Sequence, residues 1–144
     1  MAYAVFNNNE ICRIAANENE KNDLNLLFPP AIAKDISDED FLKLKKNNAI
    51  ATISGDTVSI TDISSSFENE ENLTKHISFL KTVTKDFLNP NSDNNEKILY
   101  STINNYYNTL NSFDVSTITF PLNKSWEDYC EENSIAYVSH LQIP

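Results

Sequence analysis

The residues best suited to chemistry lie near the end of the chain, in the stretch NKSWEDYCEENSIAYVSHLQIP. This stretch holds the only Trp, one of the two Cys and one of the two His. A Cys thiolate beside an imidazole is a nucleophile, so Cys130 and His140 could act together across a helix and a strand. Cys130 also lies beside Trp126 and Tyr129 on a short amphipathic helix, and this position favours packing over catalysis.

The other reactive side chains give weaker catalytic signals. His76 falls on or beside the apolar stripe of a predicted helix, where no Cys, His or carboxylate lies three or four residues away to complete a metal pair. A single Gly excludes a Gly-x-Ser-x-Gly elbow and disfavours a phosphate-binding loop. The acidic clusters fall largely in the first turns of helices, where carboxylates oppose the dipole. The sequence therefore predicts no enzyme, no catalytic residue, no metal site and no cofactor.

The formal net charge of −10 comes from 21 acidic and 11 basic side chains among 144 residues. Because phosphate contacts need clustered Lys and Arg, direct nucleic-acid binding and membrane binding are both disfavoured. No apolar run approaches the ~20 residues of a membrane span, and MAYAVFNNNE lacks the features of a secretory signal. Cys12 and Cys130 have no CxxC spacing, which is typical of thiols in a reducing compartment. We therefore expect synthesis in the cytoplasm.

The chain begins with a predicted β-hairpin. Asn8–Asn9 would form its two-residue turn, which places Tyr3 opposite Ile14 and Val5 opposite Cys12 on one face. Cys12 is then a small core residue rather than a nucleophile. After the hairpin, NENEKNDLNLLF indicates a short helix that the two prolines end, and AIAKDI indicates a strand.

A capped helix and a second hairpin follow. Ser37 opens SDEDFLKLKKNN with a capping box, acids occupy the first turn, and Asn47–Asn48 supply the stop. In AIATISGDTVSITDI, a Gly55–Asp56 turn pairs residue 53 with 58 and residue 51 with 60. Alternation gives one polar face of Thr and Ser, and one apolar face made of Ala49, Ala51, Ile53, Val58 and Ile60.

From Ser65 the apolar period becomes helical. Two helices are predicted to pack as an antiparallel αα-hairpin, with the apolar seams Leu73, Ile77, Leu80, Val83 and Phe87 in one and Leu99, Ile103, Tyr106, Leu110 and Phe113 in the other. STITF is then predicted to be a strand. Ser125 begins another capping box, which opens a short helix through about Glu132, and SIAYVS reads as a final strand.

These elements predict an α+β fold, in which antiparallel β-hairpins form a sheet and a long antiparallel αα-hairpin and short capped helices accompany it. The length is that of about one domain, and no linker divides it. We therefore expect a single domain over residues 1–144, with a hairpin-rich part (1–63), a helical hairpin (64–114) and a closing strand-helix-strand segment (115–144).

The apolar ending LQIP suggests a terminus that docks, on its own domain or on a neighbour, because free termini normally fray. Together with an exposed hairpin edge, the segment Trp126–Pro144 is the predicted contact surface for partners. Its candidate partner-binding residues are Trp126, Tyr129, Tyr137, Leu141, Ile143 and Pro144.

Three stretches carry a resemblance: MAYAVFNNNEICRIAANENEKNDLNL, ISGDTVSITDI and LNKSWEDYCEENSIAYVSHLQIP. In these stretches, about half its length, the chain resembles small virion-associated or hypothetical proteins of marine tailed bacteriophages. The resemblance contains no motif of known chemistry, so it assigns no functional residue. It implies a non-enzymatic capsid, neck, tail or fibre component, localised in the virion.

The expected function is therefore that of a phage structural or accessory protein acting through protein–protein contacts. Its partners would be other phage structural proteins or further copies of the chain. Two alternatives remain within the same setting: a phage assembly factor, and an acidic inhibitor or nucleic-acid mimic that binds a basic host protein. An enzyme that uses Cys130 and His140 is the third hypothesis.

Overall fold

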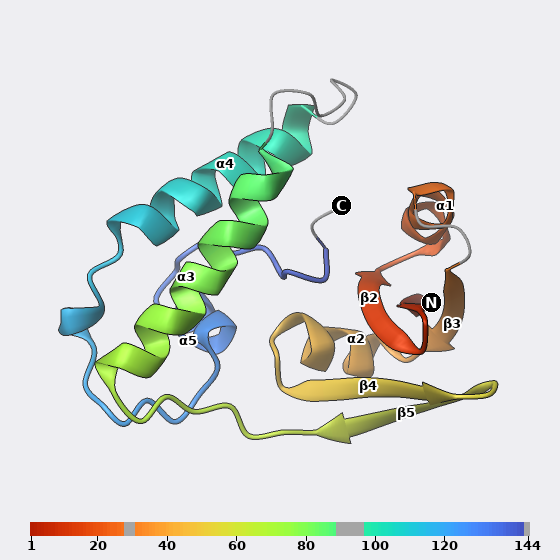
Figure 1. The fold of residues 1–144 in the computed structure, drawn as a ribbon, viewed down its shortest axis with the longest axis horizontal. Helices are drawn as coiled ribbons and strands as arrows, with labels where there is room; N and C mark the ends of the chain where they lie inside the picture. The colour runs from red at the N-terminus through yellow and green to blue at the C-terminus, as the bar shows by residue number, and fades with distance from the viewer. Residues whose placement is uncertain (28–30, 89–96, 143–144) are drawn as a thin grey trace. The chain divides into compact units, whose positions relative to one another are not determined.

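The computed structural model describes residues 1–27, 31–88 and 97–142 and shows an α+β protein (Figure 1). The described chain divides into two compact units. The first unit is Met1–Ser64, and the second comprises the described residues from Ser65 onward. This boundary falls one residue from the predicted border between the hairpin-rich part and the helical hairpin. Within the described ranges, no helix is long and apolar enough to cross a membrane.

The first unit is built on a five-stranded antiparallel sheet with the strand order β3-β1-β2-β4-β5. The strands are β1 (Ala2–Asn7), β2 (Glu10–Ala15), β3 (Ile32–Ile36), β4 (Ala49–Ser54) and β5 (Thr57–Asp62). Helix α1 (Glu18–Leu27) connects β2 to the segment before β3, and α2 (Asp38–Lys45) packs on β1, β2 and β4. Strands β3 and β5 are therefore the two edges of the sheet.

The first hairpin has the predicted turn but a different register. Asn8 and Asn9 both have positive φ, 54° and 65°, so they form the predicted two-residue turn. A β-bulge then shifts the pairing between Val5 and Phe6, so that Val5 pairs with Arg13 and not with Cys12. Cys12 is the extra residue on β2, and its thiol donates a hydrogen bond to the Val5 carbonyl at 3.3 Å.

Because of the bulge, the predicted register is wrong beyond Phe6, counted from the turn, and different side chains lie opposite each other. Tyr3 pairs with Ala15 and not with Ile14, because every residue of β2 beyond the bulge is displaced by one position. Tyr3, Val5 and Cys12 still pack in one apolar cluster, as the sequence predicts. Cys12, the inserted residue, therefore stays on the expected face, and the pairing partners of the residues around it change.

The capped helix and the second hairpin agree with the sequence predictions. The Ser37 hydroxyl accepts a hydrogen bond from the Asp40 amide at 3.0 Å. Helix α2 ends at Lys45, and Asn47, two residues later, has a φ of 57° that allows the Asn48 amide to bond back to the Lys43 carbonyl at 2.8 Å. In the hairpin, residue 53 pairs with 58 and residue 51 with 60, and Ala49, Ala51 and Ile53 are buried.

The second unit is helical. It contains α3 (Glu70–Phe87), α4 (Lys97–Ser112), a short 3-10 helix η2 (Val115–Thr117) and α5 (Trp126–Glu132). Helices α3 and α4 run side by side in opposite directions (Figure 1). The described seam residues of α3 and α4 share one core cluster, and the side chains of Phe87 and Leu99 lie outside the described part of the chain.

Two predicted strands are wrong. STITF supplies the last two residues of η2 and then bends, because the Asp114 carboxylate accepts a hydrogen bond from the Ser116 amide at 3.0 Å and so starts a helical turn. SIAYVS belongs to no strand: Ser134 has a positive φ of 57° in the turn that follows α5, and residues 135–139 are assigned to no helix or strand. The one β-bridge described in this unit joins Phe67 to Leu122.

Candidate functional site

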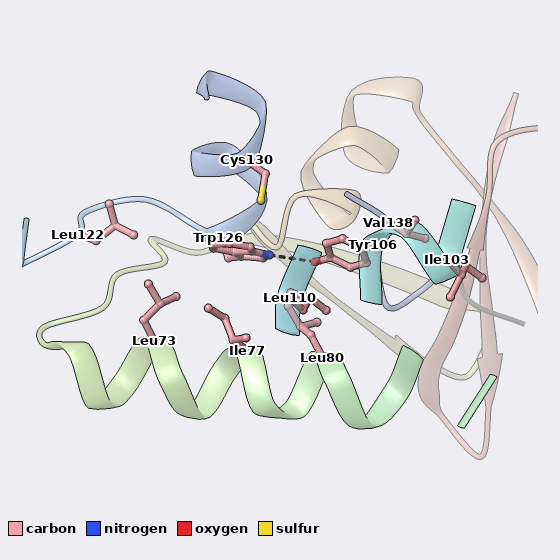
Figure 2. Packing of buried hydrophobic residues seen from close by; sticks show 10 residues of the cluster. All are labelled: Leu73, Ile77, Leu80, Ile103, Tyr106, Leu110, Leu122, Trp126, Cys130 and Val138. Carbon is pink, nitrogen blue, oxygen red and sulfur yellow. Dashed lines mark hydrogen bonds between the residues drawn. The ribbon is translucent and has the colours of Figure 1, made fainter. Parts of the chain in front are cut away.

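The predicted contact residue Trp126 lies in the core of the second unit. Its side chain is fully buried, and its Nε1 donates a hydrogen bond to the Tyr106 hydroxyl at 2.9 Å (Figure 2). Burial raises the pKa of Tyr106 well above its usual range, so this hydroxyl stays protonated. The Ser125 hydroxyl caps α5 by accepting from the Asp128 amide, which fixes the direction in which the helix carries Trp126. The Trp126 ring thus packs its own unit.

Neighbouring aromatic rings close this core. Phe113 meets Trp126 edge-on with ring centroids 4.8 Å apart, and Tyr129 stacks on Trp126 at 5.8 Å. These are favourable geometries for aromatic pairs. Of the other predicted contact residues, Tyr129 and Tyr137 are half-buried, Leu141 is buried, and Ile143 and Pro144 lie outside the described residues. Among the described contact residues, Tyr129 and Tyr137 therefore keep the most ring surface exposed.

The two cysteines are not activated as nucleophiles. Cys130 is fully buried, and burial followed by the charge of Glu127 raises the pKa of its thiol far above the ordinary value. Burial also raises the pKa of Cys12. A nucleophilic Cys needs the opposite shift, toward a thiolate at neutral pH. His140, the partner that the enzyme hypothesis would give Cys130, packs on the Phe79 ring with the ring centroids 5.9 Å apart.

The structure brings the two histidines near each other, which the sequence did not indicate. The His76 ring lies 5.4 Å from Phe67 and 6.4 Å from Phe79, and His140 contacts the same Phe79. Burial, and then the charge of His140, lower the pKa of His76. His76 is on α3 and His140 follows α5, 64 residues later in the chain, so no local spacing could have revealed the pair. Within the residues described, no group of three His, Cys, Asp or Glu side chains could hold a metal ion.

A shallow groove of about 260 Å³ lies between α4 and the extended segment 136–138. Its walls are more apolar than polar, although some of them carry hydroxyl or amide groups; the lining residues are Thr102, Asn105, Tyr106, Thr109, Ala136, Tyr137 and Val138. The groove contains no cluster of charges or nucleophiles, so it defines no reaction. The half-buried Tyr137 is one of the residues that line it.

The edge strand β5 is the clearest unsatisfied feature of the described structure. Figure 1 shows β5 as the last strand of its sheet, where it pairs with β4 alone. In a hairpin with a two-residue turn, the residues flanking the turn, Ser54 and Thr57, form the first hydrogen-bonded pair. Alternate residues of β5 then direct their backbone N–H and C=O groups away from β4; these residues are Val58, Ile60 and Asp62. No partner for these backbone groups lies among the described residues.

The β5 edge also lacks the usual protection against strand pairing. Lys, Pro and bulges commonly protect an exposed edge. Strand β5, TVSITD, has none of them, and its one charge, Asp62, is paired with Lys43 at 3.1 Å. The opposite edge, β3, carries Lys34 and Asp35 in a strand of five residues. The two edges of one sheet therefore differ in their readiness to accept another strand.

No protein-family model matches the chain, and no curated protein or solved structure matches it either. The fold and the β5 edge are thus the observations from which a function can be argued. The α+β class follows from the structure itself, with an antiparallel sheet in one unit and helices in the other.

Proposed function

We propose that this chain is a non-enzymatic phage protein, a structural or accessory component of the virion that acts through protein–protein contacts. The observation that carries the proposal is the unprotected β5 edge. Its free backbone groups suit β-strand addition, in which main-chain hydrogen bonds give affinity and alternate side chains give specificity. The virion setting comes from the resemblance of the sequence to phage proteins, and the edge supplies the mode of contact.

The outer face of the β4–β5 hairpin supports a contact role. It is mainly a row of Thr and Ser hydroxyls, but Ile50 and Ile63 are 50% and 38% exposed. Ile50 pairs with Thr61, and Ile63 follows two residues later on the same face, so the two apolar side chains are diagonal neighbours. A partner strand beside β5 would cover part of Ile63. The edge thus combines backbone hydrogen bonds with a small apolar contact.

The acidic-inhibitor alternative receives less support. A nucleic-acid mimic needs carboxylates that face a basic partner as one charged surface. Several exposed acids are instead paired with lysines of the same unit, in the pairs Lys21–Glu18, Lys34–Asp56, Lys43–Glu39, Lys43–Asp62, Lys75–Glu71 and Lys124–Glu132. Exposed pairs of this kind are worth little in stability, but they reduce the free negative charge of the surface.

Peptide mass spectrometry on gradient-purified phage particles tests the proposal. We expect this chain at a fixed copy number in particles from the phage that encodes it. Its presence in infected cells but absence from particles would overturn the structural role and favour the assembly factor or the host inhibitor. The salt dependence of binding distinguishes the assembly factor from the host inhibitor. Binding of an inhibitor to a basic host protein should weaken as the salt concentration rises, whereas binding of an assembly factor by strand addition should not weaken.

A further inference from the structure

We infer that the strand received by the β5 edge is β5 of a second copy of this chain, paired antiparallel about a two-fold axis at Ile60. The inference rests on the proposed function and names its first partner. Two-fold dimers are the commonest closed assemblies, and their interface uses the same surface on both subunits. A strand edge is suited to this symmetry because an antiparallel pair of identical strands is itself two-fold symmetric.

The backbone restricts the possible registers. Val58, Ile60 and Asp62 direct their hydrogen-bonding groups outward, so each must face an outward-directed residue of the second copy. An axis at Ile60 satisfies this condition: Ile60 faces Ile60, and Val58 faces Asp62 on both sides of the axis. The three outward residues of each strand are then used.

Charge selects this register over its neighbours. Moving the axis by one residue toward the turn would place Asp56 opposite Asp62 of the second copy, and like charges directly opposite are destabilising. Moving it by one residue the other way would make the two Asp62 carboxylates diagonal neighbours. With the axis at Ile60, they are four residues apart along the strand, about 14 Å.

The side chains are self-complementary in this register. On the inner face, the half-buried Ile60 side chains meet each other at the axis. On the outer face, Ser59 lies opposite Thr61 of the second copy, and hydroxyl pairs of this kind contribute favourably across strands. Ile63 would lie opposite Thr57 of the second copy, which covers part of its exposed surface. The ten strands of two sheets would then form one continuous sheet.

The overall charge predicts how this dimer responds to salt. Two copies of a chain with net charge −10 repel each other at a distance. The contact itself is made by neutral backbone groups and hydroxyls, so salt should screen the repulsion and strengthen association. This is the opposite of the salt response expected for an acidic inhibitor on a basic protein.

A charge-pair experiment tests both the dimer and its register. Ser59 and Thr61 are exposed and face each other across the proposed axis, so S59K/T61K places Lys opposite Lys, and S59E/T61E places Glu opposite Glu. Sedimentation of the full chain should show a wild-type dimer, while each double variant self-associates at least tenfold more weakly. An equimolar mixture of the two variants should restore dimers, as heterodimers. T52K/S54K, on the β4 side of the same face, is the matched control and should dimerise like the wild type.

A second measurement does not depend on substitutions. In hydrogen exchange, the amides of Val58, Ile60 and Asp62 should gain protection as the wild-type concentration rises through the dimerisation range. A wild-type chain that stays monomeric up to millimolar concentration, or a mixture that stays monomeric, would overturn the inference. Circular dichroism melts of each variant establish that the comparison is made between folded chains.

Particle incorporation separates failure of the inference from failure of the proposed function. If the chain is monomeric but both double variants are lost from particles, the edge binds another virion protein, and only the dimer is refuted. If the chain is monomeric and both variants are incorporated like the wild type, the edge is not a contact, and the proposed mode of action fails as well.

Discussion

The aromatic core around Trp126 and the β5 edge differ in how their apolar and hydrogen-bonding groups are satisfied. Trp126 buries its ring among Tyr106, Phe113 and Tyr129 and donates its one N–H inside the same unit. Strand β5 buries part of its apolar face but leaves the outward backbone groups without a described partner. Both regions are predicted contact surfaces from the sequence, and only the edge keeps a set of unused hydrogen-bonding groups.

The difference shows which kind of group points to a partner. An apolar side chain can be buried by whatever lies next to it in its own unit, so a conspicuous Trp is weak evidence of an interface. The backbone groups of an edge strand can be satisfied only by water or by another strand, because their direction is fixed by the sheet. Backbone direction is therefore the stronger signal in this protein.

The largest expected effect comes from Trp126→Ala. Removing a fully buried ring leaves a cavity, and changes of this kind cost ~3–5 kcal/mol. Chemical denaturation monitored by circular dichroism should measure this loss. Leu42→Ala, at a side chain that is 49% exposed on α2, is the control and should change stability little. A stable W126A chain that no longer enters particles would instead make Trp126 a contact residue and remove the contrast between the two regions.

A smaller loss is expected from Tyr106→Phe. The substitution keeps the ring but removes the acceptor of the Trp126 N–H, and an unsatisfied buried donor costs ~1–3 kcal/mol. Tyr107→Phe, at the half-buried neighbouring position, is the matched control. If the two variants melt at the same temperature, the Trp126–Tyr106 hydrogen bond contributes nothing to the stability of the core. The core would then be held by packing alone.

The third substitution, Gly55→Ala, tests the hairpin that presents the edge. Gly55 has a φ of +59°, a left-handed conformation that costs a residue with a side chain roughly 1–2 kcal/mol. An added Cβ would meet no atom within 4 Å, so the cost is conformational and not steric. Ser54→Ala, beside the turn, should be nearly neutral in the same denaturation experiment. Equal stability of the two variants would show that the turn changes conformation to accommodate the added methyl group, which would also allow the β4–β5 pairing register to shift.

The sequence predicted much of the first unit because its signals are local. The Gly55–Asp56 turn and the alternation around it determine the pairing of β4 with β5, and Ser37 and Asn47 mark the two ends of α2. The bulge at Cys12 could not be found in this way. One inserted residue leaves an apolar alternation that can be read in either register, and only the pairing distinguishes them.

The second unit was less predictable because its features depend on distant contacts. The helical seams were found from their period, but SIAYVS has the composition of a strand and forms none, so composition misled. His76 and His140 meet only through the fold. The burial of Trp126 was open in the sequence, since a capped amphipathic helix can pack inward or against a partner. The β5 edge was anticipated as a class of surface, and its missing protection became evident from the strand order.

The smallest effect is expected from acid, which acts through the protonation of His76 in α3. Its folded-state pKa lies below the ordinary value of 6.5, first because the ring is partly buried and then because His140 is near. The unfolded chain therefore takes up this proton at a higher pH than the folded chain does. Stability from the neutral ring is fully present above about pH 6.5 and is lost as pH falls through the lowered folded-state pKa.

His76→Gln should remove this part of the acid sensitivity, because glutamine does not titrate. Denaturation midpoints measured from pH 7.5 down to pH 5 should fall more steeply for the wild type than for H76Q, while dimerisation at pH 7.5 should be the same for both. Parallel pH curves would mean that the folded unit accommodates a charged His76. A change in dimerisation would instead show that the second unit, which contains His76, is coupled to the β5 edge. The two regions would then not be independent of each other.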